Sequence, residues 1–265
     1  MTRRLAALVA VTALILAACG SSSAPALTDP REILAQSITA LQGVKTAHLH
    51  LDVSGSFSGD VTGSGTPTTI DLSGTTADAD VDLTNKDIHI ALSVPALLGV
   101  TADIIVIGSD TYTKVSLLGS KYKKSTTTAA LGSLAPLSSG GALPSNLPTD
   151  PAQILADVKA ALDKLVTPPV KDADEQCGDQ SCYKVSVTIT PADLAASGMA
   201  LGTGVSGTAA VDVWVRTSDL IPAKIVATVN GGSQGSLTAT LTFSKVNGSV
   251  TIAPPPPDQI DTSGS

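Results

Sequence analysis

Hydrophobic and polar residues alternate along most of the chain, which is the pattern of β-strands that bury one face. The alternation is clearest over residues 46–54, 77–83 and 236–246. Within 77–83 every polar position is an aspartate, and carboxylates on one face must lie in water. Residues 104–107 (Ile-Ile-Val-Ile) are apolar on both faces and predict a central strand. The pattern therefore predicts an antiparallel sheet with one apolar and one solvated face.

Two segments change to the period of an α-helix, and each begins with a capping signal. The first helix is predicted from Pro30, after the capping residue Asp29, and ends before Gly43. The second begins at Pro151 and carries a broad apolar stripe as far as Leu165. Helices of this kind would cover the apolar face of the sheet. The predicted fold class is α+β: a large antiparallel sheet with two or more helices against it.

An apolar segment without a clean period lies between these elements, from Ala129 to Leu147. It contains five leucines among Gly, Ser and Pro. Long loops of this kind in a compact domain are usually functional or disordered. Two interpretations stay open: a loop packed over the core, or a mobile apolar lid at the mouth of an apolar pocket.

The N-terminus has the features of a secretory signal peptide. Two arginines precede a short apolar run, which ends in Leu16-Ala17-Ala18-Cys19. This ending resembles the lipobox of bacterial lipoproteins, in which the cysteine sulfur receives a diacylglycerol, the chain is cut before the cysteine, and the new amine is acylated with palmitate. The resemblance makes Cys19 the lipid attachment site on the extracytoplasmic side of the cell membrane. The alternative is an ordinary signal peptide with a chance cysteine.

The composition of the chain divides it into four parts. Residues 1–18 are the predicted lipoprotein signal peptide, and residues 19–28 form a flexible tether rich in Ser and Ala. Residues 29–252 form a single domain. The run of four prolines that follows predicts a disordered tail over residues 253–265.

Two further cysteines, Cys177 and Cys182, lie close together in the sequence. An even number of cysteines in an exported chain predicts a disulfide, here closing a small loop. No histidine lies near them to complete a metal site.

The sequence contains no known catalytic motif: it lacks a Gly-x-Ser-x-Gly elbow, a His-Glu-x-x-His motif and a phosphate-binding loop. We therefore expect neither an enzyme nor a cofactor. The chain has 265 residues and a net charge of −7, which does not suit nucleic acid. Aromatic residues make up 2% of the chain, so its core must either pack many small side chains or leave an interior space.

Three groups of polar residues have an alternative functional interpretation. The histidines could bind a metal and the aspartates calcium, but we expect both to be a solvated strand face. The lysines could contact anionic lipid headgroups, but we favour an ordinary exposed hairpin as their explanation. The residues concerned are His48, His50 and His89; Asp78, Asp80 and Asp82; and Lys121, Lys123 and Lys124.

Three short motifs occur in a recognisable order behind the lipobox. They are Lys45-Thr46-Ala47-His48 before the first strand, residues 150–155 (Asp-Pro-Ala-Gln-Ile-Leu) opening the second helix, and residues 211–215 (Val-Asp-Val-Trp-Val) in a late strand. In this order they resemble the LppX/LprG type of actinobacterial lipoproteins, whose half-barrel sheet wraps around helices and is similar to LolA-like carriers.

The resemblance implies a carrier that binds the acyl chains of lipids or glycolipids in an apolar cavity between sheet and helices. It would move them across the cell envelope, with an envelope transporter as a further candidate partner. The alternative is a surface interaction or sensor module with a filled core. The residues expected to line the cavity are Leu34, Ile38, Ile104, Val106, Leu134, Leu137, Leu155, Val158, Ala161, Leu162, Val213, Leu237 and Leu241.

Overall fold

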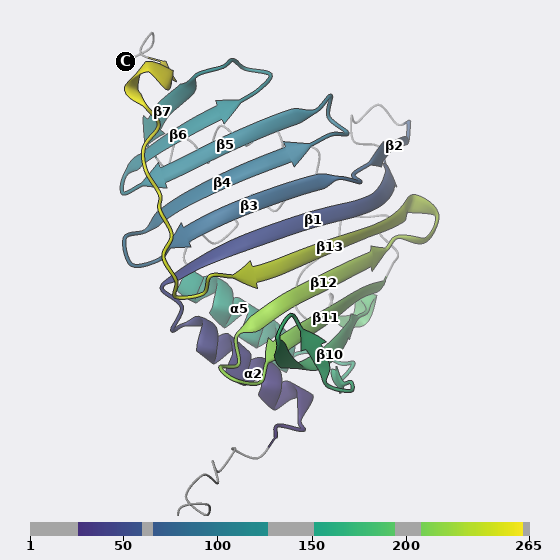
Figure 1. The fold of residues 1–265 in the computed structure, drawn as a ribbon. Coiled ribbons are helices and arrows are strands. Elements are labelled where there is room, and N and C mark those ends of the chain that lie inside the picture. Colours follow the sequence, from purple (N-terminus) through teal and green to yellow (C-terminus); the bar gives the residue numbers. More distant parts are fainter. Residues whose placement is uncertain (1–25, 60–65, 127–150, 194–207, 262–265) are drawn as a thin grey trace, which may run out of the picture.

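A computed structural model describes residues 26–59, 66–126, 151–193 and 208–261. Its described residues form one curved sheet with two α-helices, α2 (Pro30–Leu41) and α5 (Pro151–Asp163). Figure 1 shows both helices behind the sheet, at the end formed by the late strands. The predicted fold class is confirmed. Neither helix is long and apolar enough to cross a bilayer, and the same holds for every described helix.

The sheet has fourteen strands within the described residues, in the order β14-β7-β6-β5-β4-β3-β1-β13-β12-β11-β10-β8. In addition, β2 pairs with β1 and β9 pairs with β10. All pairs are antiparallel except β14 with β7. The strands are β1 (Thr46–Gly59), β2 (Thr68–Asp71), β3 (Thr75–Asp82), β4 (Asp87–Val94), β5 (Val100–Ile107), β6 (Asp110–Val115), β7 (Tyr122–Thr126), β8 (Val170–Lys171), β9 (Glu175–Cys177), β10 (Gln180–Ile189), β11 (Thr208–Arg216), β12 (Pro222–Asn230), β13 (Gly235–Ser244) and β14 (Ile260–Asp261).

The long central strand β1 joins the two halves of the sheet, because it pairs with β3 on one side and β13 on the other. Two glycines allow the backbones of β1 and β13 to approach each other closely. Gly55 and Gly235 both have positive φ, and a Cβ on either would lie 2.2 Å from a carbonyl oxygen of the opposite strand. A side chain at either position would push the two strands apart.

The main hydrophobic core lies between α2 and the strands β10 and β11. Ile33 and Leu34 of α2 pack with Val185, Val213 and Val215 of these strands. Cys177 and Cys182 form the predicted disulfide across the turn between β9 and β10.

A second, smaller core lies on the opposite face of the sheet. Ile105 of β5 packs there with Tyr112 and Tyr122, and Ile252 and Ile260 close over them. The tail predicted to be disordered from residue 253 is therefore ordered as far as Asp261, and that prediction is wrong over this stretch. The physical reason is that an isoleucine on each side of the proline run is partly buried against β5–β7. Figure 1 shows this segment in yellow, running from the end of β13 to β7.

Candidate functional site

The face of the sheet that carries the helices is apolar across its width. A row of directly opposed residues crosses it with one residue from each of β10, β11, β12, β13, β1, β3, β4, β5 and β6. Residues that oppose each other in an antiparallel sheet point to the same face. The row is Val185, Val213, Ile225, Leu241, Leu51, Ala77, Leu92, Ala102 and Val115.

A cavity of about 350 Å³ lies between this face and the two helices. Its volume is within the range typical of ligand sites, roughly 300–1,000 Å³. Of the residues that line it, Ser37 alone has a polar side chain, and none is titratable. The lining residues are Leu34, Ser37, Ile38 and Leu41 of α2; Leu155, Val158, Ala161, Leu162 and Leu165 in and after α5; and Val187, Ile189, Val211, Val213, Pro222 and Ile225 of the sheet.

The predicted lining residues fall into three groups. Leu34, Ile38, Leu155, Val158, Ala161, Leu162 and Val213 line the cavity. Ile104, Val106, Leu237 and Leu241 do not, and the prediction is wrong for them. They lie on the same apolar face, but on β5 and β13, whereas the cavity is bounded by α2, α5 and β10–β12. Leu134 and Leu137 lie outside the described residues, as does the segment 129–147 that contains them.

The lining residues that the sequence prediction missed come mainly from the late strands. Val187, Ile189, Val211 and Ile225 have the same alternation as Val213, and all of them line the cavity. The alternation could have identified these residues. Ser37 had no such signal, because it is a buried polar residue within the apolar face of α2.

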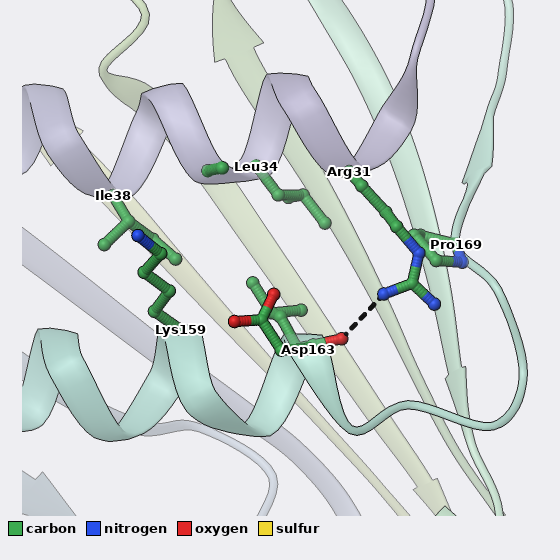
Figure 2. A pocket seen from close by; sticks show the side chains of 8 residues that line it. Arg31, Leu34, Ile38, Lys159, Asp163 and Pro169 are labelled. Atoms are coloured by element: carbon green, nitrogen blue, oxygen red, sulfur yellow. Dashed lines mark hydrogen bonds between the residues drawn. The ribbon is translucent and has the colours of Figure 1, made fainter.

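Arg31 connects the two helices at one end of the cavity. Its guanidinium donates hydrogen bonds to the carbonyl oxygens of Leu162, at 2.9 Å, and Leu165, at 3.3 Å. These carbonyls lie in and just after the last turn of α5, where a cation also suits the helix dipole. Figure 2 shows Arg31 reaching from the start of α2 to the end of α5, with Leu34 between the helices. The clamp therefore fixes α5 against α2.

Asp193 fixes the end of α5 against the end of β10. One carboxylate oxygen accepts hydrogen bonds from the backbone N–H groups of Val166, at 2.7 Å, and Thr167, at 3.2 Å. The other accepts from the hydroxyl of Thr190, at 2.6 Å, and from its N–H, at 2.8 Å. These bonds, the Thr190 hydroxyl first, hold the pKa of this buried carboxyl well below its ordinary value of 3.8. The charged form is thus the one that the fold stabilises.

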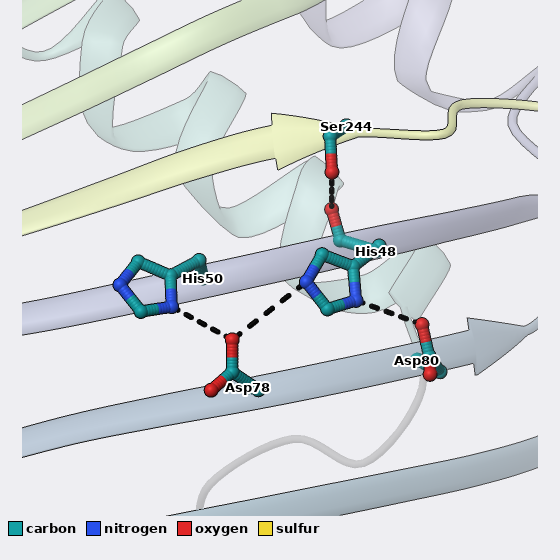
Figure 3. Close-up of polar contacts among 5 residues, drawn as sticks. All are labelled: His48, His50, Asp78, Asp80 and Ser244. Atoms are coloured by element: carbon teal, nitrogen blue, oxygen red, sulfur yellow. Dashed lines mark hydrogen bonds and ion pairs between the residues drawn. The ribbon is translucent and has the colours of Figure 1, made fainter.

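The polar outer face carries pairs of histidine and aspartate between neighbouring strands. Nδ1 of His48 lies 2.8 Å from Asp80, and Nδ1 of His50 lies 2.7 Å from Asp78. Figure 3 shows the two pairs side by side, linked by a 3.7 Å contact between His48 and Asp78. These side chains were predicted to be simply solvated; instead they pair, because the strand register places them opposite each other.

His89 makes a third pair of this kind, 3.1 Å from Asp103. In the described ranges, no group of three or more His, Cys, Asp or Glu side chains is arranged to hold a metal ion.

We compared the chain with known protein families, curated proteins and solved structures. No family model matches the chain, and no curated protein matches it. Among solved structures, LprF from Mycobacterium bovis matches with a TM-score of 0.51 and 20% identity, over 85% of this chain and 96% of LprF. The chain has the LprF fold. The resemblance inferred from the sequence is thereby confirmed for the fold.

The lipoprotein LppX from Mycobacterium tuberculosis also matches, with a TM-score of 0.48 and 18% identity, over 84% of this chain and 98% of LppX. We base the fold assignment on LprF. In this chain the LprF fold holds its cavity between α2, α5 and strands β10–β12.

Loss of the Arg31 clamp should weaken the fold at the end of α5. We expect Arg31→Ala to lower the free energy of unfolding by roughly 1 kcal/mol, since two charged hydrogen bonds are lost at an exposed site. Hydrogen exchange of the last turn of α5 should accelerate. Lys159→Ala, which removes a cation facing the same gap, is the control. Equal effects of the two changes would contradict the clamp.

Asp193 should make stability depend on pH. Its pKa is lower folded than unfolded, so its stabilisation is complete above the unfolded pKa and is lost as pH falls towards the folded one. Asp193→Asn should therefore unfold at a lower temperature than the wild type at pH 7, and this difference should shrink below about pH 4. Thermal unfolding across pH measures both effects. Asp179→Asn, in the exposed β9–β10 turn, should show neither.

Proposed function

We propose that this protein is a membrane-anchored lipoprotein that binds the acyl chains of a lipid or glycolipid in the cavity between α2, α5 and β10–β12. The observation that carries the proposal is the lining, which has one hydroxyl and otherwise only apolar side chains. A site of this composition offers an acyl chain a place out of water and offers no acid, base or nucleophile pair. It supports binding rather than catalysis.

The energetics favour such an occupant. A chain of about sixteen carbons in water costs roughly 12 kcal/mol, at about 0.8 kcal/mol per methylene. An acyl chain in the cavity avoids part of this cost, because the side chains around it are almost all apolar.

The anchor is the second part of the proposal. Cys19 would carry the diacylglycerol and the palmitoyl group, and two or three acyl chains hold a protein durably to a bilayer. The domain would then stand on the extracytoplasmic side of the membrane. The two arginines and the short apolar run before Cys19 support this placement. We further propose that the protein carries the bound lipid across the cell envelope, and that a transporter donates or accepts this lipid.

A bulky side chain in the cavity should displace the ligand. We expect Ala161→Phe to reduce bound lipid several-fold, because Ala161 lines the cavity, whereas Ala160→Phe, next to it on the exposed side of α5, should leave it unchanged. Organic extraction of the purified full chain, followed by mass spectrometry, measures non-covalent lipid per protein.

The same pair of variants tests the alternative of a filled core. In that case Ala161→Phe would cost about 1–3 kcal/mol in unfolding free energy through overpacking, and neither the wild type nor Ala160→Phe would release lipid. That result would exclude the carrier and leave an interaction or sensor module.

The anchor has its own test. Mass spectrometry of the membrane-extracted chain should find Cys19 as the first residue, carrying both the diacylglycerol and the palmitoyl group. Cys19→Ala should carry no acyl group and should leave the membrane fraction. A mature chain with a free thiol at Cys19 would rule out the anchor without affecting the cavity.

A further inference from the structure

Two turns of the sheet expose pairs of leucines. The β4–β5 turn holds Leu97 and Leu98, which are 43% and 92% exposed. The β6–β7 turn holds Leu117 and Leu118, which are 63% and 73% exposed. Single exposed apolar residues are ordinary, but four large ones on neighbouring turns form a patch that water disfavours. We call these four residues the leucine edge.

The two turns lie at the same end of the sheet. Strands β4 to β7 are consecutive and antiparallel, so alternate turns share an end, about 10 Å apart for two strand spacings. Two hydrogen bonds tie the β6–β7 turn to the start of β5, next to the β4–β5 turn: the N–H of Ser116 to the carbonyl of Thr101, at 2.9 Å, and the N–H of Thr101 to the hydroxyl of Ser116, at 3.0 Å. Figure 1 shows these strands side by side in the upper half of the sheet.

The backbone of the β4–β5 turn holds Leu98 outward at some cost. Leu98 has a φ of 58°, a left-handed conformation that favours Gly or Asn and that leucine rarely adopts. The turn is nevertheless well defined, with hydrogen bonds from Gly99 to Pro95 and from Val100 to Leu97. A leucine that is both strained and almost fully in water gains nothing from the fold. Strain of this kind is a ground for seeking a function.

The charge near the leucine edge is positive, although the chain as a whole is acidic. Residues 111–125 contain four lysines and no carboxylate. Within the described part of the chain Lys121 and Lys123 form no ion pair, while Lys124 pairs with Asp110 at 2.8 Å. The turn at the opposite end, between β3 and β4, holds one lysine, Lys86, between two aspartates. The β6–β7 hairpin thus matches an anionic surface.

We propose that the leucine edge docks on an anionic lipid bilayer. The leucines enter the boundary between headgroups and acyl chains, and the ammonium groups of Lys121 and Lys123 contact the lipid phosphates. This contact is separate from the anchor. The described chain begins beside β10, where the N–H of Leu27 meets the hydroxyl of Tyr183 at 3.2 Å, in the other half of the sheet. Docking requires neither an occupied cavity nor acylation of Cys19.

Tryptophan quenching tests this contact locally in the full chain, however the N-terminus binds. Leu118→Trp would be mixed with vesicles of phosphatidylcholine and phosphatidylglycerol that carry brominated acyl chains. The matched control is Leu83→Trp, at the turn between β3 and β4, where Leu83 is 37% exposed. Wild-type emission from the nearly buried Trp214 gives the background.

The expected result is a blue shift and several-fold stronger quenching for Leu118→Trp than for Leu83→Trp. Vesicles of phosphatidylcholine alone should quench the emission of Leu118→Trp less than the anionic vesicles do. Adding Lys121→Glu and Lys123→Glu to this variant should also reduce its quenching by the anionic vesicles. Leu98→Trp is a second reporter, and unfolding midpoints equal to the wild type show that each variant is folded. Folded variants that are quenched equally at both ends, or at neither, would overturn the proposal.

Discussion

The register of the strands is the constraint on which the rest of this structure depends. The apolar row through Val213, Leu241 and Leu51 is followed, one residue along each strand, by a row through Trp214, Thr242 and His50 on the other face. A slip of one residue in any strand would place charges against the helices and valines in water. The alternation therefore determines not only that strands form but how each one pairs. The cross-strand pairs of histidine and aspartate reinforce the same register on the outer face.

The cavity exists because the side chains of the two helices do not fill the space above the apolar face of the sheet. Interiors normally pack as densely as organic crystals, and aromatic rings are the usual means of closing large gaps. Here the helices contribute Leu, Ile, Val, Ala and one Ser, the strands contribute Val, Ile and Pro, and no aromatic ring is present in the lining. The tryptophan and the tyrosine of β10 and β11 are used elsewhere. Trp214 lies on the outer face, with the ammonium of Lys224 at 3.7 Å from its ring. Tyr183 belongs to the core beside α2.

Much of this architecture could be predicted from local patterns, and the errors have physical causes. Alternation and capping residues are local, so strands such as β1 and helices such as α2 could be located. Alternation specifies which face a residue occupies, but not which element packs against that face. For that reason Leu241 and Ile104 were placed on the correct face and wrongly in the cavity. Cross-strand pairs such as His50 with Asp78 need the register, which depends on contacts far apart in sequence.

The ordered tail is the most instructive of these errors, because a sequence signal for it was present in β5. A strand that is apolar on both faces needs cover on both, and Ile105 points away from the helices. Ile252 and Ile260 supply that cover, and the prolines between them stiffen the segment that spans the two contacts. Strand β14 then pairs with β7 at Tyr122 and Lys123, directly after the turn that exposes Leu117 and Leu118. The ammonium of Lys114 lies 4.5 Å from the ring of Tyr122 and adds a further contact there. The C-terminal segment thus buries one side of the β6–β7 hairpin, as α2 buries one side of β10. This contact holds the turn of the hairpin in a fixed position, while Leu117 and Leu118 at its tip stay in water.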